Sequence, residues 1–311
     1  MALSPGAWPA ITAILLVRGL FAALPAASVD MGDMLMMDRF RQWQATHNRS
    51  YLSAEERLRR FRVYRDNVEY IDATNRRGDL TYELGENEFL ARYASSYEMI
   101  LASRCLWAVA TPSCGRPAAT MIAPWRLRLP AGTGDPRAPS HRSSPKAQDA
   151  YDGGCNRGSF HRAYNWIVEN GGLTTAADYP YTAVRGACNR AKSAHHTVKI
   201  LGGGVIPPRN EPEMQVAVSG QPIGVAIEVG SGMQFYKSGV YSGPCGTNLA
   251  HAVTIVGYGV DAPTGAKYWL VKNSWGQTWG ESGYIRMRRE VGGPGLCGIA
   301  LDVVYPKMAK A

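Results

Sequence analysis

A histidine and an asparagine at the ends of two apolar runs are the residues of this chain best suited to catalysis. His251 opens a β-branched run, and Asn273 closes a second run that begins at Tyr268. The turn-forming segment 261–265 joins the runs, so the pattern predicts a β-hairpin with one polar residue at an end of each strand. An Asn side chain can accept the ring N–H of the histidine, fix its tautomer and aim its other nitrogen at a nucleophile. Trp275 could shield that hydrogen bond from water.

For an isolated pair, a buried histidine beside a turn asparagine is the more common explanation, but the surrounding residues favour catalysis. The chain reads His-Ala-Val-Thr-Ile-Val-Gly-Tyr-Gly from position 251 and Lys-Asn-Ser-Trp-Gly from position 272. These blocks resemble the His and Asn blocks of the papain family of cysteine proteases. The resemblance implies that His251 is the general base and thiolate partner, that Asn273 orients it, and that Trp275 covers it. It implies no cofactor and no metal.

The cysteine that such chemistry needs is missing from its expected place. In the family the motif Cys-Gly-Ser/Ala-Cys-Trp/Tyr carries the nucleophile, whereas residues 111–119 here read Thr-Pro-Ser-Cys-Gly-Arg-Pro-Ala-Ala. Alignment on Cys114 puts Pro117 where the nucleophile belongs and Ala118 where the aromatic residue belongs. We therefore expect no peptidase activity. Recruitment of Cys114 itself as the nucleophile is the less favoured alternative.

The whole segment 104–149 departs from the family pattern. It holds seven of the nineteen prolines of the chain, and a proline inside a helix costs about 3 kcal/mol. Pro117, Pro124 and Pro130 would interrupt the helix that the family begins at its nucleophile, so we predict a disordered segment. The spacing from Cys114 to Cys155 is nevertheless the one expected for the family. This favours a coding region read out of frame, with an evolved inactive homologue as the alternative.

The residue pattern of the N-terminal third predicts two amphipathic helices, which by themselves would fit a small helical domain of no particular function. Met34, Met37, Phe40 and Trp43 recur at helical spacing, and Ser53-Ala-Glu-Glu56 is a capping box that opens a longer helix with Leu58, Phe61, Tyr64, Val68 and Ile71 on one face. The pattern Glu56-x3-Arg60-x3-Tyr64-x2-Asn67-x3-Ile71-x3-Asn75 resembles the helix motif of papain-family propeptides. Gly85-Glu-Asn87-Glu-Phe89 resembles their second motif, in which Ala91 stands where an Asp is usual. The resemblance implies a propeptide that lies through the active-site cleft.

The C-terminal half resembles the mature enzyme from about residue 150. Gly158, before a helix with Phe160, Tyr164, Ile167 and Val168 on one face, matches the loop that hydrogen-bonds bound peptide in the family. Strands are predicted at 198–200, 223–227, 235–241 and 283–287. The resemblance also implies disulfides between Cys245 and Cys297 and between Cys114 and Cys155, and leaves Cys188 without its usual partner.

The composition indicates a secreted globular protein. The apolar run Trp8–Val17 is too short to span a bilayer and is followed by small residues at Ala26 and Ala27, so we predict a cleaved signal peptide. Six cysteines fit an oxidising compartment. Of the net charge of +9, +6 lies within residues 104–147 (seven Lys or Arg less one Asp). No nucleic-acid motif accompanies this charge, and we expect a monomer that binds neither nucleic acid nor membrane.

Together these features predict an α+β protein, an α-helical propeptide followed by a papain-like two-domain fold whose helical half is incomplete and whose β-barrel-like half is intact. The expected parts are a signal peptide (1–27), a propeptide (28–103), an aberrant segment (104–149) and a papain-like remnant (150–311). The predicted function is that of a cysteine endopeptidase precursor of the secretory pathway, extracellular or in a vacuole or lysosome, acting on protein or peptide substrates if active. The alternative is a non-catalytic inhibitor of other cysteine proteases.

Overall fold

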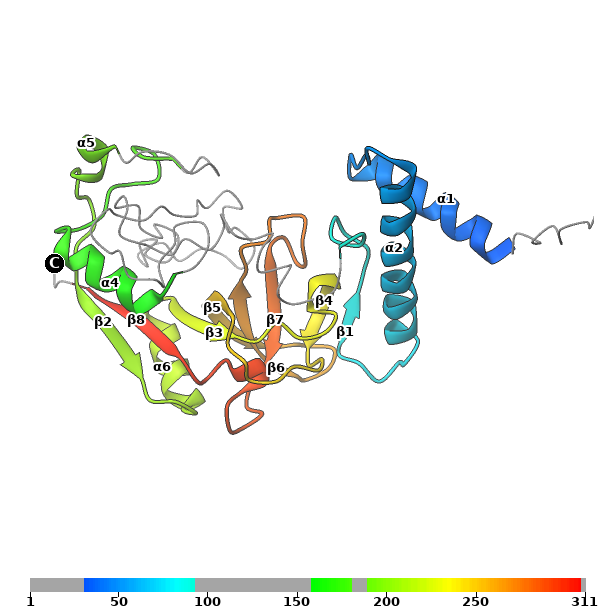
Figure 1. Cartoon of the computed structure of the whole chain (residues 1–311). Helices are drawn as coiled ribbons and strands as arrows, with labels where there is room; N and C mark the ends of the chain where they lie inside the picture. The colour runs from blue at the N-terminus through cyan, green and yellow to red at the C-terminus, as the bar shows by residue number, and fades with distance from the viewer. Residues whose placement is uncertain (1–30, 93–157, 181–188, 309–311) are drawn as a thin grey trace, which may run out of the picture.

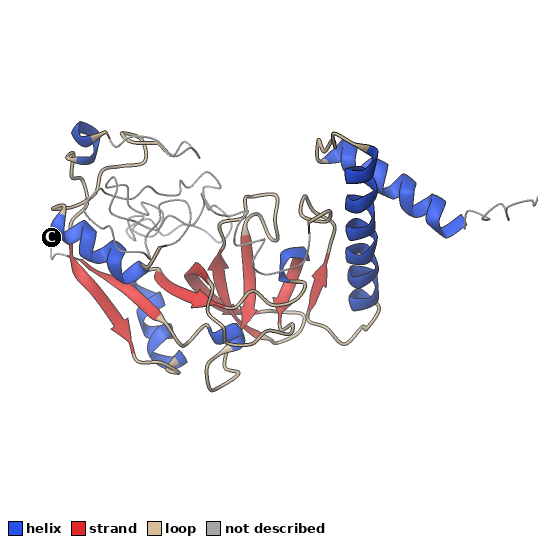
Figure 2. Ribbon diagram, in the orientation of Figure 1, coloured by secondary structure: helices blue, strands red, loops and turns tan. Residues whose placement is uncertain are grey.

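The computed structural model describes residues 31–92, 158–180 and 189–308 (Figure 1). The predicted signal peptide, the aberrant segment 104–149 and the cysteines at positions 105, 114, 155 and 188 lie outside these residues. The described part is an α+β fold in which two long helices stand at one end of an extended sheet (Figure 2). No helix within the described ranges is both long and apolar enough to cross a membrane.

The two N-terminal helices form a hairpin, as the sequence predicts. They are α1 (Met31–Thr46) and α2 (Ala54–Asn75). The capping box is confirmed, because the Ser53 side chain accepts a hydrogen bond from the Glu56 N–H at 3.1 Å. Aromatic rings hold the helices together: the Phe40 ring lies 5.1 Å from that of Tyr64, and both side chains are fully buried.

Two residues placed on the buried faces of these helices are exposed instead. Met34 is 57% exposed and Leu58 is 46% exposed. Both line an open groove between α1 and α2 with a volume of about 500 Å³. Helical periodicity identifies an apolar stripe, but in a two-helix hairpin only part of that stripe finds a partner.

The described strands form one eight-stranded sheet with the order β1-β4-β7-β6-β5-β3-β8-β2. Their bounds are β1 (Tyr82–Leu84), β2 (Ile200–Ile206), β3 (Ile223–Ile227), β4 (Tyr236–Tyr241), β5 (His251–Val260), β6 (Lys267–Lys272), β7 (Tyr284–Arg288) and β8 (Val303–Met308). The predicted hairpin is confirmed, since β5 and β6 pair in antiparallel from Thr254 and Lys272 outwards. The β1 strand belongs to the N-terminal part and pairs with β4, so the propeptide region extends the sheet of the C-terminal half.

The remaining helical elements are shorter than α1 and α2. They are α4 (Phe160–Glu169), α5 (Arg190–Ser193), α6 (Glu211–Gly220) and the 3₁₀ turns η1 (Met233–Phe235) and η2 (Leu296–Gly298). The α4 helix packs on β2 and β8 through Phe160, Tyr164 and Ile167, as predicted, whereas Val168 is 43% exposed and does not join this face. The helix ends at Glu169 with Asn170 as its C-cap, and Gly171 follows with a φ of 79°.

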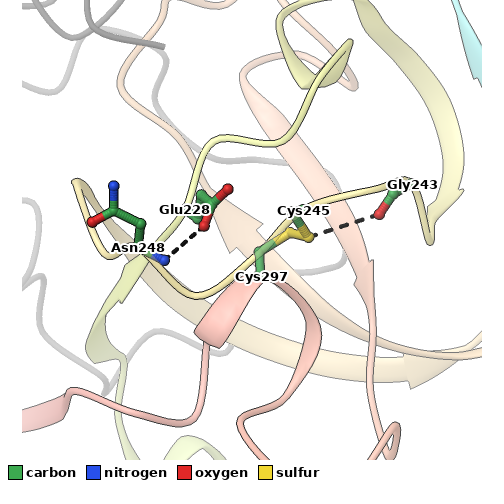
Figure 3. The surroundings of a disulfide bond; sticks show 5 residues. All are labelled: Glu228, Gly243, Cys245, Asn248 and Cys297. Atoms are coloured by element: carbon green, nitrogen blue, oxygen red, sulfur yellow. Dashed lines mark hydrogen bonds between the residues drawn. A yellow bond between two sulfur atoms is a disulfide. The ribbon is translucent and has the colours of Figure 1, made fainter.

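A disulfide joins Cys245 to Cys297 with an S–S distance of 2.04 Å (Figure 3). It ties η2 to the loop between β4 and β5. In the same loop, the Asn248 N–H donates to the Glu228 side chain at 2.6 Å. These contacts fix the chain just before β5, the strand that begins with His251.

Candidate active site

The hairpin brings His251 and Asn273 together. His251 is the first residue of β5, is 1% exposed and lies opposite Ile227 of β3 in the register. Asn273 follows the last residue of β6, and its backbone N–H donates to the Gly283 carbonyl at 3.0 Å. The His251 Nε2 atom lies 2.9 Å from the Asn273 Oδ1 atom. The ends of two paired strands therefore set the distance between the two side chains.

The asparagine determines which ring nitrogen of the histidine carries a proton. Its Oδ1 atom also accepts the backbone N–H of Ser274 at 2.7 Å. Because this oxygen can only accept, the His251 Nε2 atom must donate, and in the neutral ring Nδ1 is then the basic nitrogen. This is the tautomer that a general base needs when its orienting partner is bonded to Nε2.

An indole ring covers the pair. The Trp275 ring is stacked on the His251 ring with 5.1 Å between centroids, and Trp275 is only 7% exposed. The Trp279 ring meets Trp275 edge-on at 4.9 Å. Sequence reasoning placed Trp275 here from the resemblance, whereas it did not single out Trp279, whose position depends on the fold of the loop after β6.

Burial keeps the imidazole neutral. It lowers the pKa of His251 from its ordinary value of 6.5 to about 4, although the hydrogen bond that the ring donates to Asn273 acts in the opposite direction. A neutral, oriented imidazole can accept a proton from a nucleophile. A stable imidazolium would require an anion beside the ring, as in a thiolate–imidazolium pair.

The propeptide region closes over this site. The Phe89 ring lies 6.2 Å from the Trp275 ring, on the propeptide side of it. The Asn87 side chain donates to the Gln234 carbonyl at 2.6 Å, and the Trp279 indole donates to the same oxygen at 2.9 Å. Sequence reasoning identified Asn87 and Phe89 as parts of a motif, but it gave no signal for Gln234. The Gln234 side chain is buried, and neither of its polar atoms has a hydrogen-bond partner within the described structure.

The remaining predicted site residues are not brought to the pair by described contacts. Gly158 is half-buried and lies two residues before α4, and its part in substrate binding stays a prediction. Cys114, Cys155 and Pro117 lie outside the described residues. Across the described ranges there is no cluster of three or more His, Cys, Asp or Glu side chains that could hold a metal ion.

Fold and site together match a known class, and the chain belongs to the papain family of cysteine proteases. The description "Papain family cysteine protease" matches residues 144–307, and "Cathepsin propeptide inhibitor domain (I29)" matches residues 40–91. The propeptide and the protease body that the sequence predicted therefore each match the description of a known domain family.

Plant proteases are among the relatives. Fruit bromelain from Ananas comosus is 34% identical over 335 residues, which covers 94% of this chain and 93% of that protein. The cysteine endopeptidase RepA from Oryza sativa subsp. japonica is 50% identical over 156 residues, or 49% of this chain and 41% of that protein. Among solved structures, a recombinant stem bromelain precursor has a TM-score of 0.69 at 35% identity and covers 89% of this chain and 100% of that one. The proform of Amb a 11, a ragweed pollen cysteine protease, has a TM-score of 0.68 at 29% identity. These proforms support a propeptide that lies in the cleft of its own chain.

Proposed function

We propose that this chain is a cysteine endopeptidase precursor that retains the base and its orienting residue but lacks the nucleophile. In an active member of the family a thiolate attacks the peptide carbonyl and the imidazolium protonates the leaving amine. His251 and Asn273 are assigned those supporting roles, and Trp275 is assigned the role of cover. The observation that carries the proposal is the 2.9 Å contact between His251 Nε2 and Asn273 Oδ1 beneath Trp275.

What the chain lacks is a nucleophilic side chain at the position where the family has its catalytic cysteine. Alignment on Cys114 places Pro117 where the nucleophile belongs, and a proline has neither a thiol nor a hydroxyl to attack a carbonyl. The alignment with fruit bromelain runs over 335 positions but includes 94% of the 311 residues of this chain, about 292, so about 43 aligned positions have no residue here. That shortfall supports a lost piece of chain and fits a coding region that is read out of frame.

The wider proposals follow the family. The body, if active, would hydrolyse protein or peptide substrates bound along a cleft that includes Gly158. The protein would act as a monomer in the secretory pathway, outside the cell or in a vacuole or lysosome. Residues 1–27 would be removed as a signal peptide and residues 28–103 would act as the propeptide.

The experiment is an activity assay combined with covalent labelling. The expressed chain, before and after removal of its propeptide, is incubated with a fluorogenic peptide substrate and with a thiol-directed active-site probe. We expect no turnover of the substrate and no His251-dependent labelling by the probe, because loss of the attacking residue abolishes most of the rate even when its partners remain. Labelling of Cys114 that disappears in a His251→Ala variant would contradict it, since it would identify a recruited nucleophile.

A second candidate is favoured by one specific observation. The inhibitor-domain match at residues 40–91 coincides with a helix hairpin that has its own aromatic packing around Phe40 and Tyr64. Such a chain could inhibit other papain-like proteases without catalysis. The intact chain is then added to an active papain-like protease at a fixed molar ratio of chain to protease. It should lower the rate of substrate cleavage, and an unaltered rate rejects this candidate.

A further inference from the structure

The turn between α1 and α2 contains the only Asn-x-Ser/Thr sequence of the chain, Asn48-Arg49-Ser50. In a protein that passes through the secretory pathway, such a triplet is the acceptor sequence for an N-linked oligosaccharide. The triplet also arises by chance, so it indicates a modification site only under two conditions. The folded chain must leave the asparagine open to solvent, and its own structure must not already account for both polar side chains.

The first condition is met, because both polar residues of the triplet are exposed. They lie in the segment that follows Thr46, the last residue of α1, and precedes Ala54, the first residue of α2. Neither the Asn48 nor the Ser50 side chain forms a hydrogen bond with another residue that the structure describes. The amide nitrogen of Asn48 therefore has room for a bulky substituent.

The second condition is met as well, because the backbone accounts for the asparagine but not for the serine. Asn48 has a φ of 48°, in the left-handed region that glycine and asparagine adopt most readily after the end of a helix. The turn is closed by the main chain, since the Arg49 N–H donates to the Gln44 carbonyl at 2.8 Å. The Ser50 hydroxyl has no part in this closure. Its place two residues after Asn48 fits an acceptor sequence.

The triplet lies at the end of α2 that is remote from the pairing of β1 with β4. Figure 1 shows the turn from α1 at one end of α2 and the loop to β1 at the other. The Asn75 side chain at the C-terminus of α2 donates to the Leu84 carbonyl of β1 at 2.8 Å. A helix of 22 residues is about 33 Å long. An oligosaccharide on Asn48 would therefore leave the strand pairing undisturbed.

We propose that Asn48 is N-glycosylated in the precursor, an inference that rests on the proposed passage of the chain through the secretory pathway. The Asn48 Nδ2 atom forms a bond to C1 of the terminal N-acetylglucosamine of an oligosaccharide that is supplied on a lipid diphosphate. The bond from C1 to the diphosphate oxygen breaks, the lipid diphosphate leaves with the electron pair, and the amide nitrogen loses one proton. The oligosaccharyl transferase of the host catalyses the transfer and recognises the Ser50 hydroxyl.

The oligosaccharide would belong to the precursor and not to the protease body. Asn48 lies within residues 28–103, the proposed propeptide, and residues 104–311 contain no Asn-x-Ser/Thr sequence. Removal of the propeptide would therefore remove the oligosaccharide with it. While attached, it adds polar surface to the same turn segment as Leu52, whose side chain is fully exposed.

The test is cell-free translation of the full chain with endoplasmic-reticulum microsomes. The modified chain should migrate more slowly on a gel, and peptide N-glycosidase should abolish the shift and convert Asn48 to aspartate, which mass spectrometry detects. Ser50→Ala should lose the shift, and the matched variant Ser50→Thr should keep it. Both changes fall at an exposed position and leave the left-handed residue in place, whereas Asn48→Gln would add backbone strain at a φ of 48°.

Protection from added protease distinguishes a failure of this proposal from a failure of the proposed secretory route. A chain that is protected inside the microsomes but is not modified overturns the glycosylation proposal and leaves the route intact. A chain that stays accessible to protease contradicts the route. Residues 1–27 are then replaced by the signal peptide of an established secreted protein. Modification of this chain and of its Ser50→Thr variant, but not of Ser50→Ala, supports the site. No modification, or a shift that persists in Ser50→Ala, overturns it.

Discussion

The two hydrophobic cores of the described structure differ in what they join. The larger core runs without a break from Phe40 and Tyr64 of the propeptide region to Trp279 and Val303 of the body. The smaller core lies under α4 and contains Phe160, Tyr164, Ile167 and a few partners from β2 and β8. In this protein the propeptide is therefore part of the main core and not an appendage. Among the described residues, fewer apolar side chains are buried on the side of the body that carries α4.

The largest expected effect comes from removing a ring in the larger core. Phe40→Ala should lower the free energy of unfolding by about 4 kcal/mol, the usual loss when a fully buried aromatic side chain is truncated. Because the core is continuous, helical signal and tryptophan fluorescence should be lost in one transition during urea unfolding. Ile167→Ala is the matched change in the smaller core, with an expected loss of about 3 kcal/mol. Two separate transitions in Phe40→Ala would show that the propeptide folds independently and would break the comparison.

A pH-dependent effect of similar size is expected at the active site. The pKa of His251 is about 4 in the fold and 6.5 in its ordinary state, so below pH 6.5 the unfolded chain binds a proton that the folded chain does not. Stability is therefore complete above pH 6.5 and falls as the pH drops towards 4, by about 3 kcal/mol at 1.36 kcal/mol for each pKa unit. The unfolding free energies of the unaltered chain and of His251→Gln should be compared at pH 7 and pH 4.5. If the two proteins lose equal stability between these pH values, His251 is not buried as described.

A smaller effect is expected where the propeptide strand joins the sheet. Gly239 has a φ of 91°, and a Cβ there would lie 2.4 Å from the Thr81 carbonyl oxygen. Gly239→Ala should destabilise the chain by about 1–3 kcal/mol and separate β1 from β4, which limited proteolysis would detect as faster cleavage near residue 81. Gly265→Ala is the control, because Gly265 also has a positive φ but nothing lies within 4 Å of its Cβ position. Equal proteolysis of both variants would argue against the strand pairing.

The smallest effect is expected at a single polar contact between the two regions. The Thr278 hydroxyl donates to Glu88 at 2.9 Å in an exposed position. Thr278→Val should reduce stability by less than about 1 kcal/mol, because water replaces such a bond at little loss. A thermal melt should show a Tm within a few degrees of that of the unaltered chain. A much larger drop would place Thr278 among the main contacts that hold the propeptide.

The sequence predicted those parts of the molecule whose residues signal their structure locally. The capping box at Ser53 and the hairpin that places His251 beside Asn273 are such parts. The pairing of β1 with β4 was not predicted, since three residues of strand pattern carry no information about a partner more than 150 positions away. The contact of Asn87 with Gln234 was missed for the same reason, although the motif itself was noted. Long-range contacts of this kind depend on the complete fold.

The central proposal is that His251 is a neutral base in a chain that lacks the nucleophile, and the pKa of His251 tests this directly. Nuclear magnetic resonance of the full chain with labelled histidine, titrated between pH 3.5 and 9 under reducing conditions, gives that value. His251→Gln identifies the resonance. We predict a pKa of about 4, lowered by burial and raised in part by the hydrogen bond to Asn273. A pKa above the ordinary 6.5 would contradict it, because only a nearby anion such as a cysteine thiolate could hold a buried imidazole in its charged form.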